Sequence, residues 1–145
     1  MSHIRDILAA KGRKVWAIRQ EATVVEAALL MREQNIGGLL VKDGEHYVGI
    51  FTERDVMKRV VAERNDPAAT RVEEVMSREV ACGAPDTSIE EARAVMRDRR
   101  IRHLPVMDEQ GQLVGIVTIG DLNAYQLHSQ ELTISMLHDY LYGRV

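Results

Sequence analysis

The spacing of hydrophobic and polar residues changes along the chain, and the same succession of spacings occurs twice. Short apolar runs at 14–18 and 79–83 each predict an opening strand. After each run, apolar side chains recur every three or four positions, which predicts a helix that begins at Thr23 in the first copy and at Ser88 in the second. Both starts have the Ser/Thr-x-x-Glu spacing of a capping box, so each helix has a defined first residue.

A hairpin and a second helix are predicted after each of these helices. Four runs rich in Val, Ile and Leu form the hairpins: 36–41 with 47–51, and 101–106 with 113–117. The second helix begins at Thr52 in one copy and at Thr118 in the other. The predicted fold is therefore α+β, with a β-α-β-β-α unit made twice. We expect the two units to pack about a pseudo-two-fold axis, because each is too small to bury its apolar face alone.

The duplication sets the expected domain boundaries. We place the first repeat at 1–66, the second at 67–128, and a C-terminal helical tail at 129–145. Apolar side chains of the tail lie on one helix face: Ile134, Leu137, Tyr140 and Leu141. This face predicts a contact with a second subunit, as in a homodimer, and burial against the chain's own core is the alternative.

The composition and charge of the chain argue against several classes of protein. The 145 residues carry a net charge of −3 with acidic and basic residues interleaved, which argues against a nucleic-acid-binding face. No apolar stretch approaches the length of a membrane span and no leader is evident, so a soluble, cytoplasmic protein is expected. Cys82 is the single cysteine, expected as a small buried hydrophobe, and it excludes an intrachain disulfide and a Cys-based zinc site.

The duplicated phrase around each second helix carries the candidate chemistry. Thr52 and Thr118 begin helices, whose N-termini favour anions such as phosphate. Asp55 and Asp121, three residues later, offer the two acceptor oxygens that suit the diol of a ribose. Together these features predict a nucleotide site in each copy. The alternative is that each Thr-x-x-Asp element is only a helix cap, and one residue can serve both roles.

The paired pattern resembles a known family. Both copies have hydrophobic-Gly-hydrophobic-x-Thr-x-x-Asp, and the second reads IRHLPVMDEQGQLVGIVTIGDL from residue 101. This is similar to the cystathionine-beta-synthase (CBS) domain, and the tandem resembles a Bateman module. The resemblance implies a regulatory module, not an enzyme, that binds AMP, ATP, NAD(H) or a related adenine nucleotide in clefts between the copies. It implies no catalytic cofactor. The regulated protein is unknown, and an interaction or scaffold protein is the alternative.

The resemblance also implies individual ligand-binding residues. Arg102 and His103 would face the phosphates, where the first copy has Gly37 and Gly38. Arg54 lies inside the first Thr-x-x-Asp, where the second has Gly120, so the two pockets are expected to bind unequally. The implied walls for the base include the following residues: Ile18, Gly83 and Ile116, with Ala17, Cys82 and Ile50 beside them.

Overall fold

The computed structural model of the protein describes residues 2–142, so the last three residues of the expected 129–145 tail lie outside the described part. Helices and small sheets are mixed, which confirms the α+β class. The chain divides into two compact units. The first-copy unit is Lys14–Val80, and the second-copy unit combines the residues up to Arg13 with those from Ala81 on. This division differs from the expected sequential repeats, because the N-terminal segment folds with the second copy.

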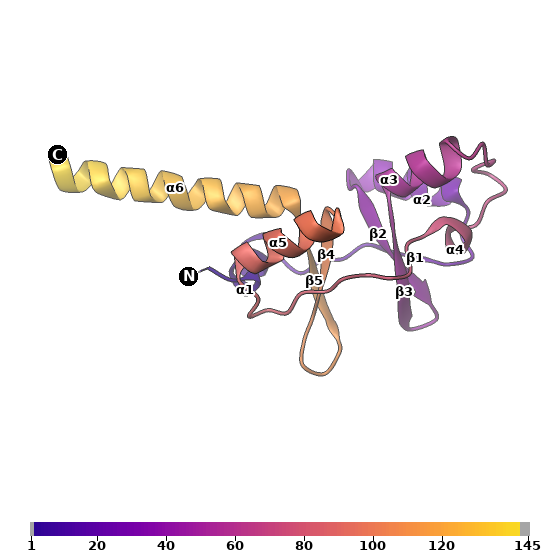
Figure 1. Cartoon of the computed structure of the whole chain (residues 1–145), viewed down its shortest axis with the longest axis horizontal. Coiled ribbons are helices and arrows are strands. Elements are labelled where there is room, and N and C mark those ends of the chain that lie inside the picture. Colours follow the sequence, from indigo (N-terminus) through magenta and orange to yellow (C-terminus); the bar gives the residue numbers. More distant parts are fainter. Residues whose placement is uncertain (1, 143–145) are drawn as a thin grey trace. The chain divides into compact units, whose positions relative to one another are not determined.

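The first-copy unit contains a three-stranded sheet in the order β1-β2-β3, with β1 parallel to β2 and β2 antiparallel to β3 (Figure 1). Its strands are β1 (Ala17–Arg19), β2 (Gly38–Asp43) and β3 (His46–Thr52). Its helices are α2 (Val24–Gln34), α3 (Glu53–Asp55), η1 (Val56–Val61) and α4 (Val72–Val75). The β-α-β-β-α order predicted for this copy is therefore present, followed by α4.

Local chemistry explains where these elements begin and end. The Thr23 side chain accepts a hydrogen bond from the backbone N–H of Glu26, and the Glu26 carboxylate accepts one from Thr23 N, which completes the predicted capping box. Asn35 ends α2 in the left-handed conformation, which Asn tolerates well. Gly44, at φ 59°, makes the tight turn between β2 and β3.

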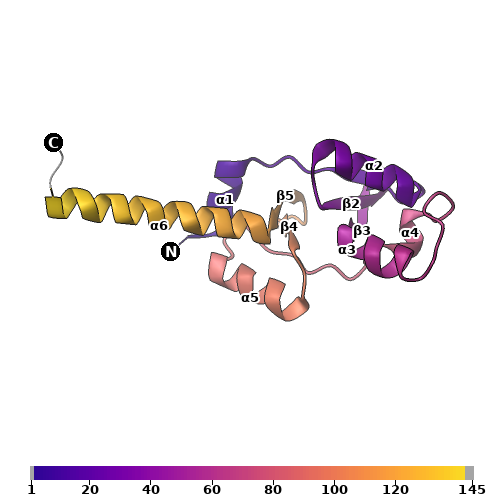
Figure 2. The ribbon, with the colours of Figure 1, turned by 90° about the horizontal axis from the view of Figure 1, so that it is seen from above.

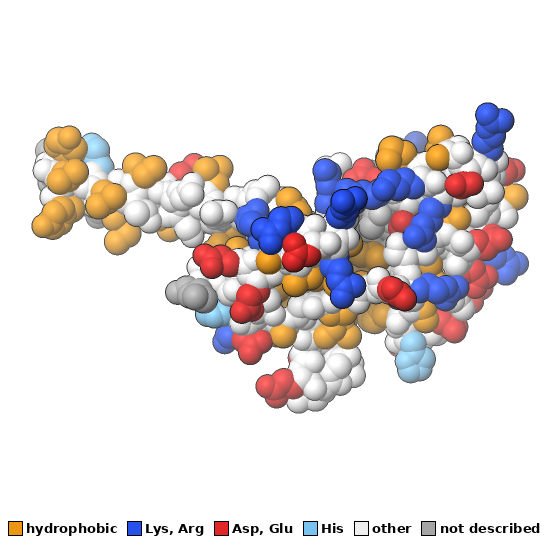
Figure 3. Space-filling view, viewed as in Figure 1, with side chains coloured by type: hydrophobic (Ala, Val, Ile, Leu, Met, Phe, Trp, Pro, Cys, Tyr) orange, Lys and Arg blue, Asp and Glu red, His pale blue; other side chains and the backbone are white. Residues whose placement is uncertain are grey.

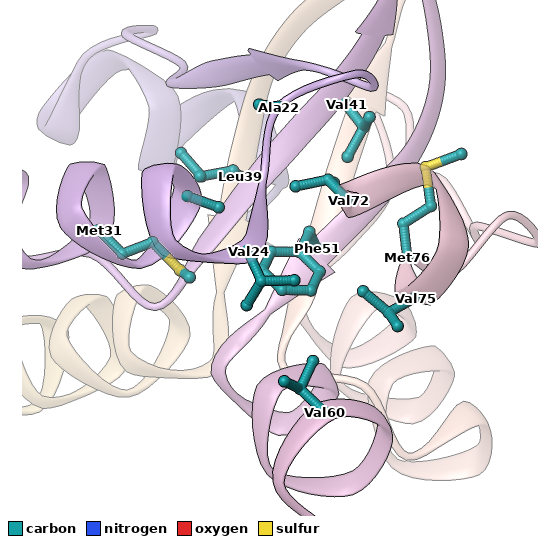
Figure 4. Packing of buried hydrophobic residues seen from close by; sticks show 11 residues of the cluster. Ala22, Val24, Met31, Leu39, Val41, Phe51, Val60, Val72, Val75 and Met76 are labelled. Carbon is teal, nitrogen blue, oxygen red and sulfur yellow. The ribbon is translucent and has the colours of Figure 1, made fainter. Parts of the chain in front are cut away.

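The core of the first-copy unit gathers side chains from the sheet and from three helical segments. Phe51 of β3 is fully buried, and Figure 4 shows it near Val24 of α2 and Val72 of α4. Three α4-region side chains, Val72, Val75 and Met76, belong to this core. These three residues fall within the expected second repeat, 67–128, yet they supply part of the first-copy core.

The second helix of the first copy departs from a regular α-helix. After the short α3 it continues as the π-helix η1, in which Ala62 N donates to Met57 O at 3.0 Å, a bond five residues back. The guanidinium of Arg59 donates to the carbonyls of Val75 and Met76, at 3.3 and 2.8 Å. Arg59 therefore satisfies backbone acceptors at the C-terminal end of α4.

The second-copy unit has a two-stranded sheet with three helices packed on it (Figure 2). The strands are β4 (His103–Met107) and β5 (Leu113–Thr118), and the helices are α1 (Ile4–Lys11), α5 (Ile89–Arg99) and α6 (Ile119–Tyr142). Its core combines α1 with the repeat: Ile4, Ile7, Leu8, Ala92, Met96, Leu104, Val106, Val117 and Leu122. Leu122 places the first turns of α6 in this core.

The opening strand expected at 79–83 was a wrong prediction, because only a single bridge between Gly83 and Val106 forms there. The first copy shows why. There Leu40 N donates to Trp16 O at 3.1 Å and Gln20 N donates to Lys42 O at 2.9 Å, which extends β1 in both directions. The positions corresponding to Leu40 and Gln20 are Pro105 and Pro85, and proline has no N–H to donate. Two prolines thus remove the rungs on either side of the bridge.

Helices α1 and α4 occupy matching places in the two units. The residue before α1, His3, bridges Ser88 at the start of α5, and the residue before α4, Arg71, bridges Thr23 at the start of α2. Helix α1 precedes the first copy in sequence yet packs on β5 of the second, whereas α4 follows the first copy and packs in it. Each unit is therefore completed by a helix that lies outside its own β-α-β-β-α segment.

Candidate functional site

Both Thr-x-x-Asp elements form capping boxes at the starts of helices. In the first, Thr52 N donates to Asp55 Oδ2 at 3.0 Å and Asp55 N donates to Thr52 Oγ1 at 3.4 Å. In the second, Thr118 N donates to Asp121 Oδ2 at 2.8 Å and Asp121 N donates to Thr118 Oγ1 at 3.1 Å. The capping role is therefore present in both copies.

Each capping box lies beside the strand that precedes it in the hairpin. Gly38 pairs with Thr52 in the β2–β3 register, and His103 pairs with Thr118 in the β4–β5 register. The first helical N–H of α6, on Ile119, donates to Arg102 O at 3.0 Å. The second-copy unit thus brings the backbone positions of the expected phosphate residues, Arg102 and His103, next to the Thr118–Asp121 element.

The equivalent backbone contact in the first copy is made to Gly37, which has no side chain. Glu53 N donates to Gly37 O at 3.0 Å, and a Cβ at Gly37 would lie 2.5 Å from Glu53 Oε1. Gly37 therefore leaves room for the Glu53 carboxylate. An anion at this helix start would meet a negative side chain, which disfavours phosphate there.

The Asp55 carboxylate is enclosed by its own unit. Its residue is only 7% exposed, and Oδ2 accepts from both the N–H and the hydroxyl of Thr52. Oδ1 accepts from Ser77 Oγ at 3.3 Å and lies 3.8 Å from Arg59 Nε. Both oxygens of Asp55 are thus engaged within the chain, which leaves little acceptor capacity for a ribose.

The Asp121 carboxylate is more accessible and is paired differently. Its Oδ2 accepts from Lys11 Nζ at 2.6 Å as well as from Thr118 N, and its side chain is 24% exposed. Lys11 Nζ also donates to Ile116 O at 2.9 Å, which leaves its third N–H for another acceptor. Both of these donors, which belong to the second-copy unit, contact Oδ2, and neither contacts Oδ1. This carboxylate therefore retains a free acceptor edge.

The backbone N–H groups expected to receive phosphate are partly used within the chain. In α6, Ile119 N donates to Arg102 O and Asp121 N donates to Thr118 Oγ1. In the first copy, Glu53 and Asp55 use their N–H groups in the same way. Phosphate binding at either helix start would therefore depend mainly on side-chain cations, of which Arg102 and Lys11 belong to the second-copy unit.

The strand glycines of the repeated phrase accommodate the chain itself. A Cβ at Gly49 would lie 2.6 Å from Ser77 O, and one at Gly115 would lie 2.8 Å from Leu8 Cδ2. The residues that approach these glycines follow α4 in one unit and lie in α1 in the other. Each strand glycine therefore gives room to the segment that completes its unit, α1 at Gly115 and the residues just after α4 at Gly49.

The residues expected to wall the base have mixed environments. Ile18 and Ile116 are half-buried, and Ile18 packs against the first-copy core. A Cβ at Gly83 would lie 2.9 Å from Ile4 Cδ1, so this position serves the packing of α1. Cys82 is exposed, which corrects the expectation of a buried side chain, and partial desolvation raises the pKa of its thiol. Contact of these residues with a base stays a prediction.

Arg54 and Gly120 occupy matching positions in the two helix starts. Arg54 is exposed on α3 of the first-copy unit, and its convergence with Arg102 and His103 stays a prediction. At Gly120 a Cβ would have its nearest neighbour, Thr118 Oγ1, at 3.6 Å, so the space there is open.

Lys11, Ser77 and Arg59 are site residues that sequence reasoning missed. Lys11 is 110 positions from Asp121, and Ser77 is 22 positions from Asp55. The signal available was the likeness of segments 4–8 and 72–76, which identifies two equivalent helices. That likeness does not say which copy each helix joins, and the partner of each carboxylate depends on that choice.

Residues 2–142 lack two further kinds of feature. This part of the chain holds no group of three or more His, Cys, Asp or Glu side chains arranged to bind a metal ion. None of its helices combines the length and apolar character needed to cross a membrane.

Comparisons with known proteins agree with the duplicated architecture. The family model "CBS domain" matches residues 4–62 and 72–128. The CBS domain-containing protein YhcV of Bacillus subtilis is 37% identical over 130 residues, which cover 90% of this chain and 89% of that protein. A solved structure of a protein with CBS domains from Burkholderia ambifaria is 41% identical, with a TM-score of 0.86 and coverage of 89% and 96%. A hexameric CBS-CP12 protein from bloom-forming cyanobacteria is 32% identical, with a TM-score of 0.73 and coverage of 83% and 65%.

Proposed function

The chain belongs to the CBS-domain family, and from this premise we propose that it is a regulatory module that binds an adenine nucleotide at the second-copy Thr118–Asp121 element. Tandem CBS domains are generally regulatory modules that bind adenine nucleotides, and stand-alone members are generally not catalytic. The ligand we propose is of the AMP, ATP or NAD(H) type. We further propose that the module acts as a cytoplasmic homodimer on a separate, unidentified protein.

The observation that carries the proposal is the free acceptor edge of Asp121. A ribose diol presents two O–H donors and needs a carboxylate that can still accept. Asp121 is partly exposed and has such an edge, whereas both oxygens of Asp55 are engaged. Arg102 and Lys11 add positive charge near the same element, which suits phosphate. The second-copy site is therefore the one we expect to fill first.

The same geometry suggests how occupancy would be signalled. Lys11 belongs to α1 and connects it to Asp121 through the 2.6 Å ion pair. A ribose bound to Asp121 and a phosphate near Lys11 would weaken that connection. Helix α1 would then be held less firmly at its C-terminal end, and a ligand that favours this state shifts its population.

Thermal unfolding with AMP, ADP, ATP, NAD, NADH and S-adenosylmethionine tests the proposal. A nucleotide at about 100 times its dissociation constant should stabilise the folded chain by roughly 2.7 kcal/mol. Asp121→Asn should weaken binding at least about tenfold, a loss of about 1.4 kcal/mol. Asp55→Asn is the matched control, because it alters an equivalent capping box and should leave the affinity unchanged.

The second candidate function is an interaction or scaffold module whose Thr-x-x-Asp elements serve only as helix caps. The observation that favours it is that both elements form complete capping boxes without a ligand. On this alternative no nucleotide shifts the unfolding temperature, even at millimolar concentration, and Asp55→Asn and Asp121→Asn differ only in stability. Equal loss of affinity in both variants would instead contradict the preference for the second site.

A further inference from the structure

Helix α6 extends far beyond the part of it that packs in the second-copy unit. Leu122 is fully buried, whereas every residue from 130 to 138 is exposed. Eight large apolar side chains of this outer part are at least half exposed; Tyr142 lies on the side of Glu131 and His138, and the other seven lie on the remaining side: Leu127, Leu132, Ile134, Met136, Leu137, Tyr140 and Leu141. Figure 3 shows hydrophobic side chains gathered along this end of α6. We call these seven residues the apolar face of α6.

The apolar face of α6 continues the side of the helix that is buried in the core. Ile119 packs against the core and Leu137 lies 18 residues later, which is five full turns at 3.6 residues per turn. Leu122 and Tyr140 are separated by the same interval. The side of the helix that packs in the core thus emerges from the unit without a change of direction, although Leu122 is 0% exposed and Tyr140 is 86% exposed.

Charged and ionisable side chains occupy the opposite side of the outer helix. His128, Glu131, His138 and Asp139 fall within an arc of roughly 100° when successive residues are placed at about 100° intervals. The apolar face of α6 contains no charged residue. Two identical copies of this face can therefore meet without like-charge repulsion, and the charged sides would remain in water.

We propose that the apolar face of α6 is a self-association surface that packs against α6 of a second copy of this chain. Seven large side chains, each at least half exposed, present on the order of 1,000 Å² per copy, compared with about 800 Å² per partner in a stable interface of standard size. Monomeric proteins rarely expose contiguous apolar patches larger than a few hundred Å². Leu127, Ile134, Leu137 and Leu141 have the seven- and three-residue intervals of a helix-pairing seam.

This inference rests on the homodimer proposed above, whose contact it locates, and it does not depend on nucleotide binding. It assigns the contact between subunits to the helix that follows the second capping box, and it identifies Ile134 and Leu137 as the centre of the contact. The similarity to a hexameric protein is compatible with association between copies, but the assignment rests on the uncharged, exposed face. Nucleotide binding can therefore fail while self-association holds, and the reverse is equally measurable.

Sedimentation velocity of the full chain over a wide concentration range tests the proposal. The wild type should sediment as a dimer or a larger assembly. The double variant Ile134→Glu, Leu137→Glu should sediment as a monomer, because it places charge in the centre of the apolar face of α6. Ser135→Glu is the matched control, since Ser135 lies on the charged side of α6, and it should assemble like the wild type.

Far-UV circular dichroism and thermal unfolding should accompany each variant. Ile134 and Leu137 lie outside the second-copy core, so the units should stay folded in the double variant. If the glutamates disrupt folding, Ile134→Ala with Leu137→Ala should still raise the dissociation constant at least about tenfold. A wild type that is monomeric at every concentration overturns the proposal, and so does an assembly that survives both double variants.

Discussion

At the scale of single residues, Gly115 and Gly120 lie five positions apart and have opposite packing environments. A Cβ at Gly115 would lie 2.8 Å from Leu8 Cδ2, and Leu8 is itself only 1% exposed. Gly120 lies in the first turn of α6 without a positive φ, and its nearest neighbour would be at 3.6 Å. We therefore expect Gly115→Ala to destabilise the folded chain by about 1–3 kcal/mol, as overpacking does.

Gly120→Ala should instead stabilise the chain by up to about 1 kcal/mol, because alanine costs less entropy than glycine in a helix. The two variants make the same chemical change, so each is a control for the other. Thermal unfolding of both measures the difference as an opposite shift in midpoint temperature. A Gly115→Ala variant as stable as the wild type would show that Leu8 is not tightly packed on β5.

Single residues also show which parts of the candidate site could be predicted from the sequence. The four caps at Thr23, Thr52, Ser88 and Thr118 were predicted correctly, because each is defined by residues three positions apart. The different surroundings of the two aspartates could not be predicted in this way. They depend on contacts across 22 and 110 positions, which a local spacing does not encode.

At the scale of elements, Pro85 and Pro105 account for the shorter sheet of the second copy. Replacing them with the residues of the first copy, Gln and Leu, restores an N–H at each position. We expect Pro105→Leu to donate to Ala81 O and Pro85→Gln to donate to Met107 O, as their counterparts do in β1 and β2. The double variant should therefore form a third strand beside β4.

Hydrogen exchange of the two new amides measures this effect directly. The net stability should change little, because two opposing effects are of similar size. Each new hydrogen bond stabilises the folded chain by about 0.5–1.5 kcal/mol. Each lost proline destabilises it by roughly 0.4–1 kcal/mol, because the unfolded chain gains conformational entropy. Both amides should nevertheless exchange slowly. Exchange at the rate of an unstructured peptide would mean that something other than the missing donors prevents the strand.

The strand expected at 79–83 does not form, and the reason can be recognised only when this run is considered together with β4, the strand it would pair with. The run at 79–83 is apolar enough to be a strand, but a strand also needs donors and acceptors on its neighbour. Pro105 lies 22 positions after the end of that run, so the lost rung belongs to a pairing that the run itself does not specify. The helices were easier to predict, since their hydrogen bonds lie within the element.

At the scale of the whole molecule, the sequence repeats and the compact units are different divisions of the chain. The repeat could be predicted because two stretches match position by position. The unit in which α1 packs could not be predicted, because Gly49 and Gly115 both leave space for a neighbouring side chain. In the structure, Leu8 of α1 lies against Gly115, and the residues after α4 lie against Gly49.

This arrangement predicts that residues 81–145 require α1 in order to fold. Ile4, Ile7 and Leu8 are at most 2% exposed, and burying three such side chains contributes roughly 5–9 kcal/mol. That is comparable to the whole stability of a typical domain, about 5–15 kcal/mol. A fragment of residues 81–145 should therefore be largely unfolded, and a peptide of residues 1–13 added in trans should restore cooperative thermal unfolding.

The fragment of residues 14–80 provides the control, because it contains its own completing helix α4 and should fold without any addition. A 1–13 peptide with Leu8→Asp should fail to rescue residues 81–145, since Leu8 is buried in their core. Folding of residues 81–145 alone, with the peptide adding no stability, would contradict the structure's assignment of α1. Rescue that depends on Leu8 would instead show that the second-copy unit is stabilised in part by α1, which precedes the first copy in the sequence.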